Sequence, residues 1–212
     1  MENKKLVLIG DIVSSRKISE RISFDKKLLQ TLDELNQRNS LIISPYTLTI
    51  GDEIQAVFED AESVFHDAIS ILSAIYPQKM RFSLGVGAII KPINTEQAIG
   101  MDGPAFHFAR DGIDAMKKSG YLFQLSGENI PHFSLHQHAL FLISHNIARW
   151  NKTRLLVLEM LLNKLPVKSI AANLHISEQA VYKTINTGAL EIIISLFTEI
   201  ETTLSRCLKG QA

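Results

Sequence analysis

The chain has 212 residues, of which 46% are hydrophobic and 21% charged, and its 22 basic residues balance its 22 acidic ones. Net neutrality argues against a general attraction to nucleic acid or anionic lipid, so such binding requires a local patch. The single cysteine, Cys207, excludes an internal disulfide and a cysteine-based zinc cluster. The sequence shows neither signal-peptide features nor the roughly 20 consecutive apolar residues of a membrane span. We therefore expect a soluble cytoplasmic protein without membrane contact.

The first part of the chain is expected to alternate strands and helices. Residues 5–13 are almost continuously apolar, as in a buried central strand. Residues 19–38 predict an amphipathic helix, and the apolar stripe expected on it is Ile22, Leu28, Leu29, Leu32 and Leu35. The next expected elements are strands at 46–50 and 54–58 joined by a hairpin, a helix at 61–76, a strand at 80–90, a helix at 103–118 and a strand at 121–125.

This element order, βαββαβ followed by αβ, predicts an α+β fold with a mostly antiparallel, helix-backed sheet of ferredoxin-like type. A helix at 136–151 is expected to serve as a linker or support. The pattern after residue 153 is all-helical, and the helices expected there span 153–163, 167–174, 177–187 and 189–208. We place the domain boundary near residue 150, with an α+β domain at 1–150 and an all-α domain at 151–212.

Two aspartates at the ends of predicted strands are the most informative polar residues. Asp11 follows the apolar strand at 5–13, and Asp52 lies in the hairpin after a second strand. Adjacent strands would bring both carboxylates to one edge of the sheet, where a divalent cation offsets their desolvation. Such an arrangement suits Mg²⁺ bound to a triphosphate. The alternative is that each aspartate only caps a turn, since Gly-Asp is a common turn dipeptide.

Four sequence segments resemble class III nucleotidyl cyclases in their order. They are Asp11-Ile12, Thr49-Ile50-Gly51-Asp52, Arg81-Phe82-Ser83-Leu84-Gly85-Val86-Gly87, and the segment from Gly103 to Arg110. The resemblance spans most of residues 5–115 and implies a cyclase-like domain that binds a nucleotide with Mg²⁺ or Mn²⁺. It implies metal ligation by Asp11, Asp52 and the carbonyl of Ile12, and a dimer, because the sites of these cyclases are usually completed across a homodimer.

The same resemblance suggests further site residues. Arg110 lies near the arginine that neutralises phosphoryl charge in these cyclases. His107 stands where they have asparagine, and Asp102 lies close to the position of an aspartate that reads the base, so a purine nucleotide is a candidate ligand. The purine-reading lysine is replaced by Leu48, and Arg110 follows His107 by three residues instead of four. Cyclic AMP synthesis therefore does not follow from the resemblance.

The loop after the first strand is a candidate phosphate-binding segment. Ser14, Ser15 and Arg16 follow Asp11 directly and can offer backbone N–H groups and a guanidinium to phosphates, with Gly51 in the facing hairpin. The alternative is an exposed loop without a ligand, since loops generally lie at the surface. Glu53 should point to the opposite strand face from Asp52, so we expect it to be a salt-bridge partner and not a third metal ligand.

The C-terminal helices carry a pattern similar to the helix-turn-helix of bacterial response regulators and sigma factors. Ala171 is small enough for a close helix crossing, and Ser177 is placed to cap the second helix. The polar side chains that this pattern leaves available for double-stranded DNA, with the cap residue, are Lys168, Ser177, Gln179, Tyr182, Lys183 and Asn186. The alternative is a helical bundle used for packing or dimerisation. The last helix could dimerise through Ile193, Ile194, Phe197, Ile200 and Leu204, or pack on the module's own first helix.

The phrases Gly10-Asp-Ile-Val-Ser-Ser-Arg16 and Gly100-Met-Asp-Gly-Pro-Ala-Phe106, combined with the C-terminal helices, make the whole chain resemble the SatD family of bacterial proteins. The leading interpretation is a nucleotide- and metal-binding domain coupled to a DNA-binding module, in a transcriptional or signalling regulator that forms a homodimer. One alternative is an active nucleotidyl cyclase or nucleotidyltransferase. Another is an interaction protein whose helical tail docks a protein partner.

Overall fold

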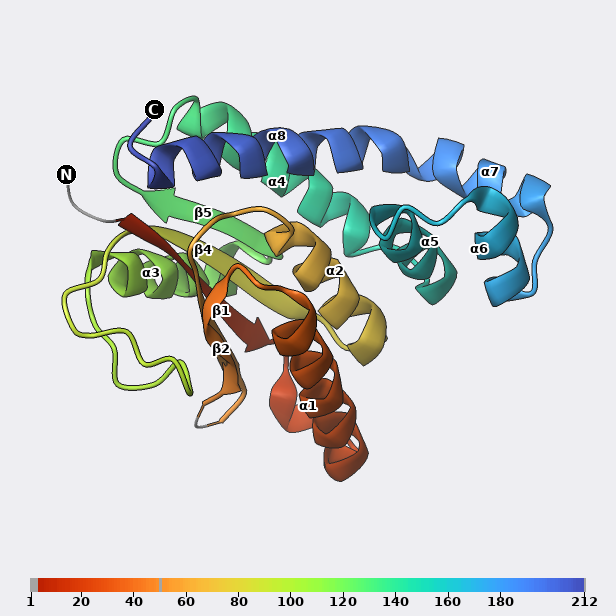
Figure 1. Cartoon of the computed structure of the whole chain (residues 1–212). Helices are drawn as coiled ribbons and strands as arrows, with labels where there is room; N and C mark the ends of the chain where they lie inside the picture. The colour runs from red at the N-terminus through yellow and green to blue at the C-terminus, as the bar shows by residue number, and fades with distance from the viewer. Residues whose placement is uncertain (1–3, 50, 212) are drawn as a thin grey trace.

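A five-stranded sheet forms the centre of the protein, with strand order β2-β3-β1-β4-β5 (Figure 1). The computed structural model describes residues 4–49 and 51–211. The strands are β1 (Lys4–Ile12), β2 (Ile42–Leu48), β3 (Glu53–Phe58), β4 (Met80–Ala88) and β5 (Phe123–Gly127). β1 pairs with β3 and β4 in antiparallel fashion, and β5 joins β4 in parallel. The element order of the first four strands is the ferredoxin-like order predicted above.

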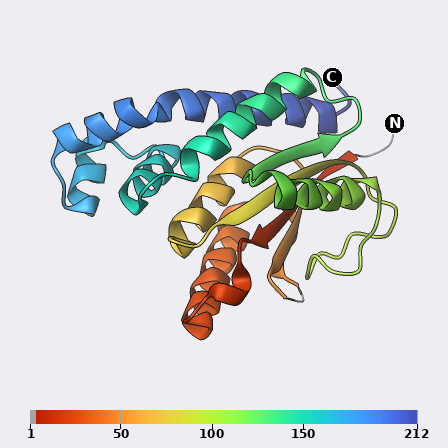
Figure 2. The same ribbon diagram turned by 180° about the vertical axis from the view of Figure 1, so that it is seen from behind.

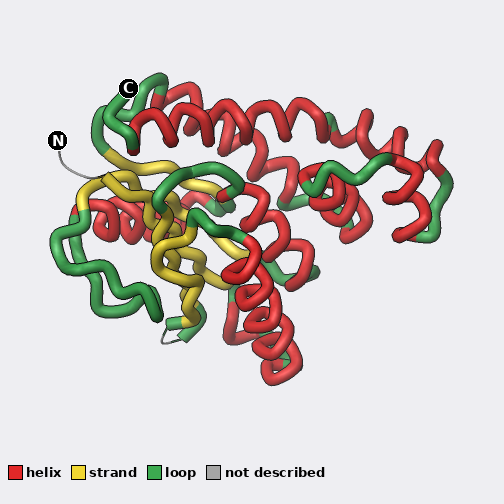
Figure 3. Tube along the Cα trace, in the orientation of Figure 1, coloured by secondary structure: helices red, strands yellow, loops and turns green. Residues whose placement is uncertain are grey.

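Eight α-helices in the described part of the chain surround or extend this sheet. They are α1 (Arg21–Arg38), α2 (Val64–Ile75), α3 (Pro104–Ser119), α4 (Phe133–Ile147), α5 (Lys152–Leu162), α6 (Val167–Leu174), α7 (Glu178–Gly188) and α8 (Leu190–Leu208). A short 3₁₀ helix, η1 (Ser15–Lys17), connects β1 to α1. α5, α6 and α7 lie at the end of the molecule away from the sheet, and α8 returns from there to the sheet (Figure 3). None of the helices in the described ranges is both long and apolar enough to cross a membrane.

The two faces of the sheet are covered by different helices. Side chains alternate along β1, so Leu6 and Leu8 belong to the large core shared with α1, α2 and α8, whereas Val7 and Ile9 belong to a smaller cluster under α3. Figure 2, seen from behind, shows α3 alone lying across its face of the sheet. Asp11 continues the alternation of Val7 and Ile9 and therefore faces α3.

α3 lies very close to β4 because glycine replaces larger residues on that strand. A Cβ added to Gly85 would lie 2.1 Å from the carbonyl oxygen of Ala105 and 2.7 Å from the backbone nitrogen of Ala109. A Cβ on Gly87 would lie 2.9 Å from the backbone nitrogen of Ala105. Glycine at these two positions of β4 therefore allows the close approach of α3.

α8 is packed against the sheet half of the chain. The Phe197 ring stacks on Phe65 of α2 at 4.4 Å between centroids and meets Phe123 of β5 edge-on at 6.0 Å. Ile193, Ile200 and Leu204 are buried in the same core. The expectation of a dimerisation stripe on this helix is therefore wrong for these side chains, since the molecule's own hydrophobic core already covers them.

The hydrophobic core runs without interruption from the sheet into the C-terminal helices, since one cluster contains buried residues of both. The helix-turn-helix pair therefore does not stand apart as a separate module. The division at residue 150 stays a prediction, and α5 packs on α2 across it.

Several element ends differ from those expected. The stripe on α1 is narrower than predicted, because Ile22 is 89% exposed and Leu29 is 44% exposed while Leu28, Leu32 and Leu35 are buried. β2 begins at Ile42, well before residue 46, and its expected end at residue 50 lies outside the described residues. α4 begins at Phe133 and ends at Ile147, a shift toward the N-terminus relative to 136–151.

Candidate functional site

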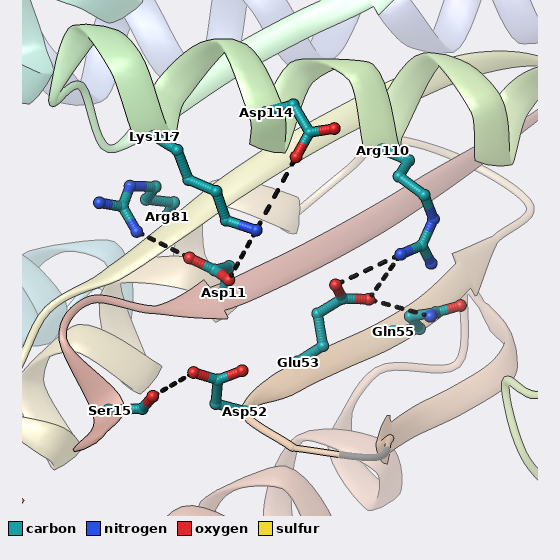
Figure 4. Close-up of polar contacts among 9 residues, drawn as sticks. All are labelled: Asp11, Ser15, Asp52, Glu53, Gln55, Arg81, Arg110, Asp114 and Lys117. Atoms are coloured by element: carbon teal, nitrogen blue, oxygen red, sulfur yellow. Dashed lines mark hydrogen bonds and ion pairs between the residues drawn. The ribbon is translucent and has the colours of Figure 1, made fainter.

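The ends of β1 and β3 bring the two predicted aspartates to the same edge of the sheet. In the β1–β3 register Asp11 lies opposite Glu53, so Asp52 is offset from it by one residue. The backbone N–H of Ile12 donates to the carbonyl oxygen of Asp52 at 3.0 Å. The two residues are thus neighbours on adjacent strands, but their carboxylates point apart, that of Asp11 toward α3 and that of Asp52 toward Ser15 (Figure 4). Their joint binding of a metal ion stays a prediction.

The Asp11 carboxylate lies between two cations. Arg81, its partner in the β1–β4 register, donates from Nη1 to Oδ2 at 2.7 Å, and Nζ of Lys117 on α3 lies 3.5 Å from Oδ1 (Figure 4). Asp11 and Arg81 are largely shielded from solvent, whereas Lys117 is about half exposed and also lies 3.8 Å from Asp114. The desolvation cost of burying Asp11 is therefore offset by ion pairing.

The Asp52 carboxylate has different partners. It accepts a hydrogen bond from the hydroxyl of Ser15, at the start of η1 (Figure 4). Gly51 beside it adopts φ +98°, a conformation that favours glycine. The Gly51 carbonyl accepts a hydrogen bond from Nη2 of Arg21 at 3.1 Å. The β2–β3 hairpin is thus joined to η1 through Ser15 and to the start of α1 through Arg21.

The connection between β1 and α1 carries the predicted phosphate-binding residues. Ser14 adopts the left-handed conformation, with φ 54°, and Ser15 and Arg16 open the 3₁₀ turn. Ser14 and Arg16 are exposed, while Ser15 is directed to Asp52. The structure therefore places Ser15 beside Asp52, at the edge of the sheet that contains Asp11 and Asp52, here called the aspartate edge. It leaves the Arg16 guanidinium open to solvent.

A second cluster of predicted residues lines a groove of about 630 Å³ between β3, α3 and the loop before α3. Nε2 of His107 lies 2.9 Å from Oδ1 of Asp102, and this contact, with the Gly103 N–H, holds the pKa of Asp102 below its usual value. Arg110 pairs with Glu53, with Nη1 3.2 Å from Oε1 (Figure 4). The expectation that Glu53 is a salt-bridge partner is confirmed. Because Glu53 lies opposite Asp11 and also lines this groove, it connects the two clusters.

Asp11 and Asp52 offer few oxygen ligands, so a metal ion bound here would take its other ligands from phosphate oxygens and water. No group of three or more His, Cys, Asp or Glu side chains placed to hold a metal ion occurs within residues 4–49 and 51–211. Mg²⁺ in nucleotide sites is commonly bound by one or two carboxylates together with phosphate oxygens and water. In this structure Asp11 is engaged with Arg81 and Lys117 and Asp52 with Ser15, so a metal ion would have to displace some of these partners.

α6 and α7 form the pair of helices expected from the helix-turn-helix pattern. The Ser177 hydroxyl accepts a hydrogen bond from the backbone N–H of Ala180 at 3.2 Å and so caps α7. Val181 and Ile185 are buried on the inner side of α7. The candidate DNA-contacting side chains, all exposed, are Lys168, Gln179, Tyr182, Lys183 and Asn186. Ser177 is also exposed, but its hydroxyl is used by the cap.

Lys117, which contacts Asp11, was not among the site residues predicted from the sequence. Arg110, Asp114 and Lys117 follow a spacing of four and then three residues, which places them on one face of a helix. Once Arg110 is taken as a site residue, this spacing indicates that Lys117 lies on the same face of the helix. Arg81 is the first residue of one of the segments that resemble the cyclases, but its pairing with Asp11 depends on the strand register.

Comparison with known proteins gives a family match and structural likenesses to 17 chains, one of which is described here. The chain has 16% sequence identity to a chain described as the structure of a bacterial light-regulated adenylyl cyclase, with a TM-score of 0.38. That match covers 58% of this chain and 42% of the other, so this chain spans less than half of that protein's length. No curated protein matches. The sequence profile of the SatD family matches residues 5–201, and the chain therefore belongs to the SatD family.

Proposed function

We propose that this protein binds a nucleotide through its phosphates, with Mg²⁺ or Mn²⁺ held by Asp11 and Asp52, and acts as a nucleotide-responsive regulator. The divalent ion would neutralise phosphate charge at the edge formed by β1 and β3. The groove lined by Asp102, His107 and Arg110 would then take the remainder of the nucleotide, and its volume of about 630 Å³ is suited to a ligand of that size.

The observation that carries this proposal is the adjacency of two acidic strand ends with cations gathered around them. The backbone bond from Ile12 to Asp52 fixes the relative position of the two aspartates. Arg81 and Lys117 now balance Asp11, and Arg110 balances Glu53. Lys117 and Arg110 are both about half exposed, so both are available for phosphate oxygens. A homodimer completing the site is part of the proposal, and light scattering of the purified chain tests it.

The test is metal-dependent binding of ATP, GTP, CTP and UTP to the full chain, measured by thermal stabilisation and calorimetry with Mn²⁺ or with a chelator. We expect at least one nucleotide to bind only with metal, and Asp52→Asn to weaken this binding about tenfold or more, because a charged ligand is lost. Asp33→Asn, on the exposed side of α1, is the matched control and should bind like the wild type. Equal binding without metal, or by Asp52→Asn, contradicts the proposal.

The same samples separate a sensor from a catalyst. A nucleotidyl cyclase or nucleotidyltransferase releases pyrophosphate from the bound triphosphate, whereas a sensor leaves it intact. We expect binding without turnover, since the chain departs from the cyclases at His107, at Leu48 and in the spacing of Arg110. Accumulation of pyrophosphate that is lost in Asp52→Asn would instead assign the enzyme.

DNA binding by α7 is a second proposed activity, supported by the capped α6–α7 pair. The exposed face of α7 carries Gln179, Tyr182, Lys183 and Asn186, with Tyr182 53% exposed. Side chains of these types contact base edges and phosphates in a major groove. The pair carries few basic residues, so a single copy should bind weakly and lose affinity steeply with salt.

Retention on double-stranded DNA at increasing salt tests this activity. Lys183→Ala should weaken retention and reduce the salt slope by about one, as expected for one lost phosphate contact. Lys26→Ala, exposed on α1 far from α7 in the chain, is the matched control. If both variants are retained like the wild type, or no salt dependence is seen, α7 serves a protein partner or packing instead.

A further inference from the structure

The outer side of α4 carries a line of exposed residues at a regular spacing. They follow one another by three, four, three and four residues and are Leu135, His138, Leu142, His145 and Arg149, the last in the turn just after the helix. Leu135 is 68% exposed and Leu142 is 62% exposed, and the three basic residues are exposed as well. Alternating intervals of three and four residues place side chains along one side of a helix. We call these five residues the α4 seam.

The inner side of α4 is fixed to the edge of the sheet. β5 is an edge strand, and two of its backbone N–H groups donate to side chains of α4. Phe123 donates to the hydroxyl of Ser144 at 3.1 Å, and Leu125 donates to Oε1 of Gln137 at 2.9 Å. α4 therefore covers the free edge of β5, and the helix that carries the seam is held in place by the sheet.

The seam itself has no cover within residues 4–49 and 51–211. The buried side of α4 packs into the large core that also contains α8, and in Figure 2 no other helix or strand lies in front of α4. One flank of the seam is aromatic, since the Phe141 ring stacks on Tyr121 at 4.1 Å and the His138 ring meets Phe141 edge-on at 6.3 Å, both between centroids. Exposed apolar and aromatic side chains gathered along one helix mark an interaction site.

The charge around the seam is basic. No aspartate or glutamate occurs in the sequence between Glu128 and Glu159, although the whole chain has as many acidic as basic residues. Arg149 carries a fixed positive charge, and the N–H groups of His138 and His145 can donate to a carboxylate. Glu199 of α8 acts on His136, which is buried on the inner side of α4. Charge complementarity therefore requires carboxylates on the partner.

The spacing indicates that the partner is a helix. Alternating intervals of three and four residues are those of a coiled-coil seam, along which two helices pack. A lipid surface would instead match a broader apolar face, whereas the α4 seam has two leucines in a narrow line. A second α4 would place basic residues against basic residues, which is unfavourable. An acidic amphipathic helix fits both the spacing and the charge.

We propose that the α4 seam binds an amphipathic helix of a partner protein, with apolar residues at the same spacing and with aspartate or glutamate beside them. Leu135 and Leu142 would pack between the apolar residues of that helix. Its carboxylates would pair with Arg149 and accept hydrogen bonds from the two histidines. The seam shares no residue with the aspartate edge or with the exposed face of α7, so this proposal does not rest on nucleotide or DNA binding.

Fluorescence anisotropy of a labelled helical peptide, titrated with the full chain, tests the proposal. The acidic peptide has four heptads with leucine at the two seam positions and glutamate on both flanks, and the basic peptide has lysine on the flanks instead. We expect the acidic peptide to bind with a Kd in roughly the micromolar range and the basic one about tenfold more weakly. Leu142→Glu should weaken the acidic peptide about tenfold or more. Arg149→Glu should weaken the acidic peptide and strengthen the basic one.

Because Leu142 is exposed, Leu142→Glu should unfold thermally like the wild type. Ile22→Glu, at a position 89% exposed on α1, is the matched control and should bind the acidic peptide like the wild type. Binding of neither peptide, equal binding of both, or equal binding by Leu142→Glu overturns the proposal. Without peptide binding, sedimentation on phosphatidylglycerol vesicles that Leu142→Glu abolishes would assign a lipid surface to the seam. A dimer that Leu142→Glu dissociates in light scattering, again without peptide binding, would assign a second copy of the chain.

Discussion

The face of the sheet under α3 and the face under α1, α2 and α8 are built from different residues. Under α3 the contact with β4 is made by small groups, with Gly85 and Gly87 against Ala105 and Ala109. The other face is filled by large side chains, and Phe65, Phe123 and Phe197 meet there in one aromatic group.

The difference explains where the charged groups can lie. Because α3 rests almost directly on the backbone of β4, polar side chains along its edge reach the strand ends, as Lys117 and Arg110 do. The bulky face instead joins the C-terminal helix to the sheet and holds most of the buried apolar surface. We therefore expect substitutions on the bulky face to change stability most, and substitutions at the α3 edge to change ligand binding with little effect on stability.

Phe197→Ala is expected to give the largest loss of stability. Removing a fully buried ring that contacts two other rings should lower the free energy of unfolding by about 3–5 kcal/mol. Urea denaturation followed by circular dichroism measures this change. Phe133→Ala, at a position 39% exposed, is the control and should cost less than about 1 kcal/mol. A loss no larger than that of the control would mean that α8 is not part of the common core.

Glu201 of α8 makes the stability of the bulky face depend on pH. Burial raises the pKa of its carboxyl from 4.5 to about 7, although its Oε1 accepts a hydrogen bond from the backbone N–H of Phe65 at 3.0 Å. Between these values the folded state holds a proton that the unfolded state has released. Stability from this group is therefore full below pH 4.5 and falls as pH rises toward about 7, by about 3 kcal/mol in total.

Glu201→Gln should remove this dependence. The amide keeps an acceptor oxygen for Phe65 and carries no charge, so the variant should be more stable than the wild type at about pH 8 and nearly equal to it at about pH 4. The difference in unfolding free energy between the two proteins, measured by urea denaturation across this range, isolates Glu201 from other titrating groups. A constant difference at all pH values would show that the pKa of Glu201 is the same in the folded and unfolded states.

On the α3 face, Gly85→Ala is expected to cost about 1–3 kcal/mol, because the added Cβ overlaps the backbone of α3 and the helix must move outward. Ala115→Val, on the exposed side of α3, is the control and should stay within about 0.5 kcal/mol of the wild type. Chemical denaturation of both variants measures the contrast. If Gly85→Ala is as neutral as the control, α3 is held less closely than its contacts indicate.

Hydrophobic periodicity predicted the element order correctly, because strands and helices bury their residues with different repeats. The predicted ends of elements were less accurate where a residue that disfavours a strand, such as proline, lies within a strand that pairs in the sheet. β2 contains Pro45 and has register shifts against β3, so its N-terminal half did not read as a strand. Ile22 and Leu29 were predicted on the buried stripe, yet they are seven residues apart on the outer face of α1, beside the face that buries Leu28, Leu32 and Leu35. Such outcomes depend on tertiary position, which periodicity does not contain.

The candidate site divides in the same way. Asp11 and Asp52 were predictable because each follows a local pattern of apolar strand and turn. The pairing of β1 with β3 is not part of the hairpin, which joins β2 to β3, and it comes from the structure. The aspartates' partners Arg81, Lys117 and Ser15 depend on register and on the approach of α3, so they became visible only in the structure. The packing of α8 against Phe65 and Phe123 likewise joins residues that no sequence spacing connects.

Lys117→Met is expected to have the smallest effect on stability. It is the variant that best separates an effect on ligand binding at the α3 edge from an effect on folding. The Lys117–Asp11 pair is 3.5 Å long and Lys117 is about half exposed, so its loss should cost less than about 1 kcal/mol. Arg81→Met leaves Asp11 without its closer, mostly buried partner and should cost more. Under the proposed function, Mn²⁺ alone should bind Lys117→Met more tightly than the wild type, since the lysine no longer competes for Asp11. Unfolding measurements combined with a Mn²⁺ titration test both points. If Lys117→Met destabilises as much as Arg81→Met, the lysine is a structural partner of Asp11, and the α3 edge then belongs to the packing of the fold.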